Sequence, residues 1–245
     1  MAPLAQRFTW RGATIVTDQH GSGPRTFVLV HGIGMGRSVF ADLIRQLASH
    51  ARVIAIDLPG YGEAPEPPLT LTVERNADVV AAFLETHRFS DVTLVGHSMG
   101  TQVAIEVAAR HPSTVRRIVL AGPTVDPRER RAPLLIGRLV QDIAIERPVV
   151  WARGAREYLR AGPNLRAKFR AMLRHRPEDT LPRVTVPALV LRGELDLVAR
   201  ADWCAEVARL LPDGTFVEVP DHGHETMIRD AAPAAAAITA FAASR

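Results

Sequence analysis

The sequence contains a single cysteine, Cys204, among its 245 residues. One cysteine excludes an intramolecular disulfide and argues against a cysteine-based metal site. No apolar run approaches the roughly 20 residues that are needed to span a bilayer, and the first seven residues lack the apolar core of a signal peptide. We therefore expect a cytoplasmic location and no membrane partner.

Lysine and aromatic residues are also scarce. Aromatic residues make up 5% of the chain, and Lys168 is the one basic residue that is not an arginine. The basic residues form no stripe interleaved with aromatic side chains, so the sequence does not favour a nucleic-acid partner. Residues 126–183 carry 14 basic and 7 acidic side chains, whereas the rest of the chain carries 16 and 19. This local excess is explained either by solvated arginine-rich helix faces or by a basic surface that steers an anionic substrate.

Apolar, β-branched runs alternate with helical stretches along most of the chain. With 47% hydrophobic and 23% charged residues, the chain can bury the core of a single domain. Residues 7–18 predict an antiparallel strand pair, and an alanine-rich helix is expected over residues 225–243. Further strands are predicted near residues 26–30, 52–56, 91–95, 115–121, 187–192 and 214–219. This alternation predicts an α/β fold, namely a doubly wound, mainly parallel sheet of eight strands with helices on both faces.

Residues 96–100 have the sequence Gly-His-Ser-Met-Gly and lie between a predicted strand and a predicted helix. A chain that leaves a strand and enters a helix within one sharp turn needs small residues on both sides of the strained central serine. Gly96 and Gly100 meet that need. The pattern therefore predicts that Ser98 is a nucleophile.

A serine nucleophile needs a histidine to take its proton and a carboxylate to orient that histidine. Asp196 follows the predicted strand near 187–192, and His224 follows the strand at 214–219. Carboxyl ends of parallel strands meet at one edge of the sheet, so both side chains can converge on Ser98. We expect His224 to act as general base and then general acid, and Asp196 to orient it.

These motifs resemble those of the α/β-hydrolase superfamily, and the resemblance covers nearly the whole chain. Residues 31–34, His-Gly-Ile-Gly, are similar to its oxyanion loop, residues 57–62 to its following loop, and residues 96–100 to its nucleophile elbow. The chain order Ser, Asp, His is also that of the superfamily. The resemblance implies an oxyanion hole made by the backbone N–H groups of Ile33 and Met99.

Two rival residues remain open within this resemblance. Asp126 is the rival acid, because some members of the superfamily carry the acid one strand earlier. His222 is the rival histidine, since it lies in the same loop as His224. We favour His224 because the superfamily pattern places the histidine directly after a glycine, and we favour Asp196 for its local motif. His31 and His97 are expected to support the oxyanion loop and the elbow.

The identity of the nucleophile limits the chemistry. Related haloalkane dehalogenases and epoxide hydrolases use an aspartate at the elbow, so the serine at position 98 argues against those two reactions. An activated serine favours acyl transfer on a small-molecule carboxylester or lactone, without a metal or cofactor. Alternatives are carbon–carbon bond hydrolysis of a diketone-type acid, a lyase or cyclase step without an acyl-enzyme, and a receptor-like binding protein. Oligomeric state is left open.

Residues 126–183 contain no convincing strand and are interrupted by several prolines. This length exceeds that of a simple crossover, and in the resembled superfamily a helical cap is inserted at this place. We expect a cap over residues 126–183 and a core domain of residues 1–125 and 184–245. Expected pocket residues are His31, Gly32, Trp151 and Val198, with a core position as the alternative for Trp151.

Overall fold

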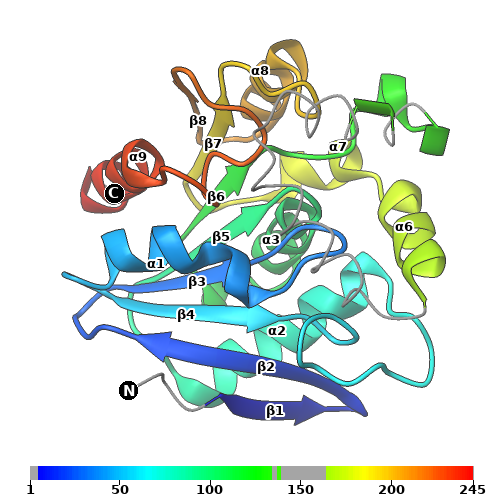
Figure 1. Ribbon diagram of the computed structural model, residues 1–245, viewed down its shortest axis with the longest axis vertical. Helices are drawn as coiled ribbons and strands as arrows, with labels where there is room; N and C mark the ends of the chain where they lie inside the picture. Colours follow the sequence, from blue (N-terminus) through cyan, green and yellow to red (C-terminus); the bar gives the residue numbers. More distant parts are fainter. Residues whose placement is uncertain (1–4, 134–136, 139–163, 245) are drawn as a thin grey trace.

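The computed structural model describes residues 5–133, 137–138 and 164–244. Within these residues, eight strands form one sheet in the order β1-β2-β4-β3-β5-β6-β7-β8 (Figure 1). β1 and β2 form an antiparallel pair, β2 is antiparallel to β4, and the other strands are parallel to one another. The strands are β1 Gln6–Trp10, β2 Ala13–His20, β3 Thr26–Val30, β4 Arg52–Asp57, β5 Val92–His97, β6 Arg117–Ala121, β7 Ala188–Gly193 and β8 Gly214–Val219. The predicted fold class is confirmed.

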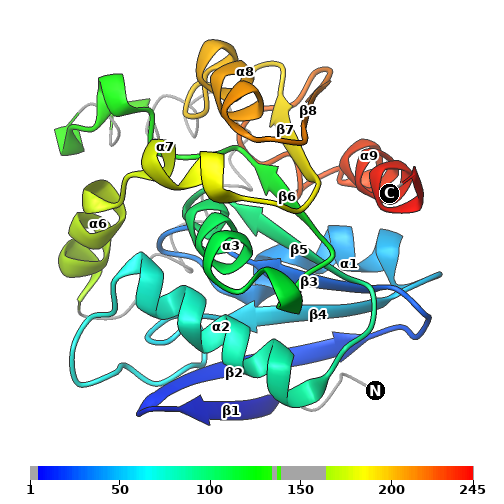
Figure 2. The same cartoon turned by 180° about the vertical axis from the view of Figure 1, so that it is seen from behind.

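Helices cover both faces of the sheet. α1 (Ala41–Leu47) and α9 (Ala232–Ser244) pack on one face, and α2 (Val73–His87), α3 (Met99–Arg110) and α8 (Ala201–Leu210) pack on the other, as Figure 2 shows for α2 and α3. Each face has its own hydrophobic core. β3, β5, β6 and β7 are buried along their whole length, which explains their nearly continuous apolar sequences.

The predicted C-terminal helix starts later than expected. α9 begins at Ala232, and residues 224–230 form turns instead. Pro233 explains the difference, because proline lacks a backbone N–H and is tolerated only in the first turn of a helix. A helix running from residue 225 would place Pro233 in its interior.

The described part of the segment between β6 and β7 contains helices and no strand. It contains α6 (Leu165–Arg174), α7 (Pro177–Thr180) and the short 3₁₀ helices η3 (Pro127–Glu129) and η4 (Leu181–Arg183). Two further 3₁₀ helices, η1 (Arg37–Phe40) and η2 (Pro112–Thr114), come before α1 and after α3, respectively. α6 lies beyond the carboxyl ends of β3, β4 and β5 (Figure 1). Trp151 lies outside the described residues.

The described helices include none that is both long and apolar enough to cross a membrane. Cys204 lies on α8 and is fully buried, and this burial raises the pKa of its thiol. Its environment is therefore that of a small core residue.

Chain order reverses around β3, which has β4 on one side and β5 on the other. In open α/β sheets such a switch point leaves a crevice at the carboxyl ends of the strands, where ligands bind. Residues 31–34 follow β3 and Ser98 follows β5, so both predicted segments lie at this switch point.

Candidate active site

Ser98 occupies a strained turn between β5 and α3. Its φ of 53° and ψ of −119° are unusual for a residue with a side chain. Its N–H donates to the carbonyl of Ala121 at 2.9 Å, which fixes the turn to the end of β6. A Cβ on Gly96 would overlap the carbonyl oxygen of Gly100, and a Cβ on Gly100 would overlap that of Val30. Both glycines are therefore required by the close approach of the backbone.

Asp196 and His224 form a buried pair at the same edge of the sheet. The imidazole Nδ1 lies 2.8 Å from Oδ2 of Asp196, and both residues are less than 10% exposed. Oδ1 of Asp196 accepts the N–H groups of Val198 and Ala199, each at 2.8 Å. Burial alone would raise the pKa of Asp196, but attraction to His224 and the hydrogen bonds outweigh it, so the pKa is lowered. The carboxylate is thus ionised and fixed in orientation.

The His224 ring lies against Gly122, the residue that follows Ala121. A Cβ on Gly122 would lie 2.8 Å from Cε1 and 2.9 Å from Nδ1 of that ring. Since Ala121 accepts the N–H of Ser98, the imidazole and Ser98 are held at adjacent points of one strand end. Gly122 was not recognised from the sequence, although a glycine directly after an apolar strand is a usable signal for close approach.

His97 supports the loop that carries His224. Its Nε2–H donates to the His224 carbonyl at 2.9 Å, and the two ring centroids are 5.0 Å apart. Burial, reinforced by the nearby His224, lowers the pKa of His97 to about 4. A neutral His97 adds no charge beside His224, and its hydrogen bond holds the His224 carbonyl.

The loop after β3 lies directly against Ser98. A Cβ on Gly32 would lie 3.1 Å from Cβ of Ser98. His31 is fully buried, and its Nδ1–H donates to the Gly32 carbonyl at 2.8 Å while its Nε2 accepts the N–H of Leu58 at 3.1 Å. His31 therefore fixes the start of this loop. Ile33 follows Gly32, is partly buried and packs against the core.

The two rival residues have other partners. The Asp126 carboxylate binds the guanidinium of Arg128 and also caps η3 through the Arg128 N–H. The ring nitrogens of His222 lie 2.6 Å from the Pro220 carbonyl and 3.2 Å from the Asp230 carbonyl, both in its own loop. The structure thus pairs the His224 ring with the Asp196 carboxylate. The side chains of Asp126 and His222 bind other groups.

A small cavity lies beside Met99, between α6 and the core. Its volume of about 10 Å³ is enough for one water molecule. The lining residues come from the loop after β4, the start of α2, the start of α3, and α6, and include Tyr61, Asn76, Met99, Lys168 and Met172. Val198, an expected pocket residue, is buried in the core on the α2 and α3 side of the sheet. Lys168 and Tyr61 were not recognised from the sequence, although a unique lysine is a visible signal.

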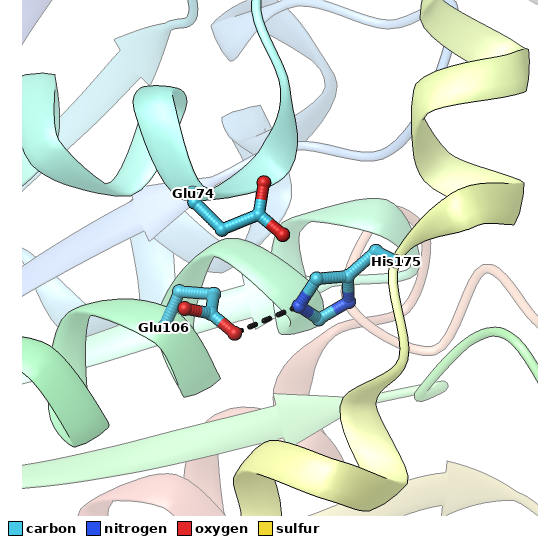
Figure 3. Close-up of side chains that lie close together, drawn as sticks. All are labelled: Glu74, Glu106 and His175. Atoms are coloured by element: carbon cyan, nitrogen blue, oxygen red, sulfur yellow. Dashed lines mark hydrogen bonds and ion pairs between the residues drawn. The ribbon is translucent and has the colours of Figure 1, made fainter.

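A second cluster of polar groups lies along α3, away from Ser98. Glu74, Glu106 and His175 form the one group in the described part of the chain whose carboxylates and imidazole could hold a metal ion (Figure 3). Glu106 Oε1 accepts hydrogen bonds from His175 at 2.9 Å and from the Thr180 hydroxyl at 2.8 Å. These bonds account for the buried Glu106 carboxylate by linking it to the residues around α7.

The comparisons with known proteins agree with the fold. The model of the Alpha/beta hydrolase family matches residues 27–238. The chain is 30% identical to the pimeloyl-acyl-carrier-protein methyl ester esterase of Chromobacterium violaceum, covering 83% of this chain and 88% of that protein. It is 28% identical to the 2-(acetamidomethylene)succinate hydrolase of Mesorhizobium japonicum, covering 86% and 85%.

Among solved structures, a thermophilic esterase from Thermogutta terrifontis superposes with a TM-score of 0.84 at 24% identity, covering 98% of each chain. This likeness shows a shared fold. The family match spans strands β4 to β8, the elbow and both loops that carry Asp196 and His224. The protein is an esterase-like hydrolase, and its chain belongs to the alpha/beta hydrolase family.

Proposed function

We propose that this protein is a serine hydrolase that cleaves a small carboxylester or lactone through an acyl-enzyme on Ser98. The observation that carries the proposal is the buried pair of His224 and Asp196, 2.8 Å apart, held beside the strained Ser98. An ionised carboxylate on Nδ1 keeps the proton there, so Nε2 is unprotonated and can act as a base. This is the arrangement that a serine hydroxyl needs in order to react at neutral pH.

In this mechanism Oγ of Ser98 attacks the acyl carbon while His224 accepts its proton. The N–H groups of Ile33 and Met99 stabilise the resulting oxyanion, each contributing about 3 kcal/mol. His224 then protonates the leaving alcohol, and the acyl-enzyme remains. In the second half, His224 activates a water molecule that releases the acid and restores Ser98.

The substrate class is supported by the relatives. One is named for hydrolysis of the methyl ester of a pimeloyl group on an acyl-carrier protein, and another for hydrolysis of 2-(acetamidomethylene)succinate. We propose an ester or lactone for this chain on the same grounds. The basic residues of the segment 126–183 would suit an anionic acyl substrate.

We also propose that residues 126–183 form a cap on a core of residues 1–125 and 184–245. The support comes from the described part of this segment. Lys168 on α6 bonds to Gly60 and Glu66 in the loop after β4, and the Gln102 amide of α3 donates to the Met172 carbonyl at 3.1 Å. These contacts seat α6 over the small cavity beside Met99.

The test compares hydrolysis of p-nitrophenyl esters of increasing acyl length by wild type, Ser98→Ala and the exposed control Ser113→Ala. Labelling with a fluorophosphonate reports on Ser98 directly. We expect Ser98→Ala alone to lose both turnover and labelling. Labelling of the wild type without ester turnover would favour carbon–carbon bond hydrolysis. Substantial turnover by Ser98→Ala would contradict the acyl-enzyme and favour a lyase or cyclase step.

A further inference from the structure

Lys168 is the one lysine of the chain, and its ammonium group is buried between α6 and the loop after β4. Its side chain is 4% exposed. Nζ donates to Oε2 of Glu66 at 2.8 Å and to the Gly60 carbonyl, and it lies 4.5 Å from the centre of the Tyr61 ring. A buried ammonium is costly unless it is paired, and here a carboxylate, a carbonyl and an aromatic face surround it.

The loop is shaped around this ion pair. Gly60 has a φ of +81°, and a Cβ there would lie 2.8 Å from Oε2 of Glu66 and 2.9 Å from Nζ of Lys168. Only glycine leaves space for the pair at this point. The other carboxylate oxygen of Glu66 accepts the side-chain amide of Asn164 at 3.1 Å. Residues in and next to α6 therefore hold both oxygens of Glu66.

Tyr61 connects this ion pair to the proposed oxyanion hole. Its ring packs edge-on against His31, with centroids 5.0 Å apart, and its hydroxyl donates to Sδ of Met99 at 3.5 Å. His31 in turn bonds to the Gly32 carbonyl, directly before Ile33. Tyr61 thus contacts the Met99 side chain and His31, whose hydrogen bond reaches the residue before Ile33, while Lys168 lies over the Tyr61 ring.

We propose that Lys168 is a positioning residue that couples the seating of α6 to the geometry of the oxyanion hole. Its ammonium holds Tyr61 between His31 and Met99, and Tyr61 keeps the N–H groups of Ile33 and Met99 aimed at one point. The inference rests on the proposed function. It implies that losing the ammonium weakens stabilisation of the transition state more than binding of the ground state.

The experiment measures ester hydrolysis and inhibition by phenylboronic acid, whose adduct with the serine resembles the tetrahedral intermediate. In Lys168→Met we expect kcat to fall about tenfold to hundredfold with little change in KM, which is less than the loss of a whole oxyanion donor. The inhibition constant should rise by the same factor as kcat/KM falls. The exposed Arg170→Met on the same helix is the matched control and should change neither value.

A double-mutant cycle tests the route through Tyr61. Once Tyr61→Leu has removed the ring, adding Lys168→Met should reduce kcat by less than threefold, because the connection is already broken. Fully multiplicative effects would overturn the inference, as would a Lys168→Met variant with unchanged kcat and boronate affinity. If Lys168→Met does not fold, Glu66→Gln supplies the same comparison with the same expected direction. If the Ser98→Ala variant turns over substrate as fast as the wild type, the proposed function is refuted instead. Failure of the inference and failure of the proposed function are therefore distinguishable.

Discussion

Replacing Gly122 by alanine should impair catalysis through a single methyl group. The new Cβ would lie 2.8 Å from Cε1 of His224, whereas carbon atoms in contact prefer about 3.5 Å. The ring would have to shift by about 0.7 Å, which would disturb its 2.8 Å hydrogen bond with Asp196. A misplacement of about 1 Å can cost about a hundredfold in rate, so we expect kcat/KM to fall about 30-fold to 100-fold.

The control for this prediction is Gly12→Ala. Gly12 has a φ of +78° and Gly122 a φ of +58°, but a Cβ on Gly12 meets nothing within 4 Å. Both substitutions should reduce the free energy of unfolding by about 1–2 kcal/mol, because both place a side chain in the left-handed region. Only Gly122→Ala should lose activity against p-nitrophenyl acetate. If both variants keep wild-type kcat/KM at equal melting temperatures, the tight fit around His224 is irrelevant to turnover and the reasoning is refuted.

Three further substitutions test other contacts. Asp196→Asn should lower kcat about 10³-fold to 10⁴-fold at neutral pH. The one oxygen of the asparagine must accept the two backbone N–H groups, so its amide nitrogen then faces His224. A loss below tenfold would contradict the role of Asp196 in orienting His224. The pKa of His97 is about 4 in the folded protein and 6.5 in the unfolded chain. The free energy of unfolding should therefore decrease by about 3 kcal/mol as the pH falls from 6.5 to 4, and urea titrations of His97→Gln should not show this decrease. Asp57→Ala should destabilise by about 3 kcal/mol in the same assay, because the Arg37 guanidinium loses its buried partner; a change under 1 kcal/mol would show that the other carboxylates near Arg37 suffice.

The fold class and the elbow could be predicted because both depend on neighbouring residues. Apolar runs identify the buried parallel strands, and the glycines at 96 and 100 reflect backbone contacts within one turn and with the adjacent strand. The local motif favoured Asp196, but Asp126 remained open because both residues follow strands at the same edge. Only the tertiary structure places Asp196 at 2.8 Å from His224 and Asp126 against Arg128.

Contacts between distant segments could not be predicted from the sequence. Lys168 lies about a hundred residues from its partners Gly60 and Glu66, so no local pattern links them. The same holds for Gly122, whose constraint comes from a loop on another strand. The late start of α9 was missed for a different reason: the alanine-rich pattern outweighed the signal of Pro233, which was present in the sequence.

The buried thiol of Cys204 makes this protein a convenient background for site-specific spectroscopy. Maleimides react with accessible thiolates, and Cys204 is fully buried with a raised pKa. A cysteine introduced at exposed Arg170 on α6, paired with one at exposed Ser113, would therefore accept a dye or spin label without prior removal of the native cysteine. Distance distributions between such labels would record whether α6 moves relative to the sheet during turnover.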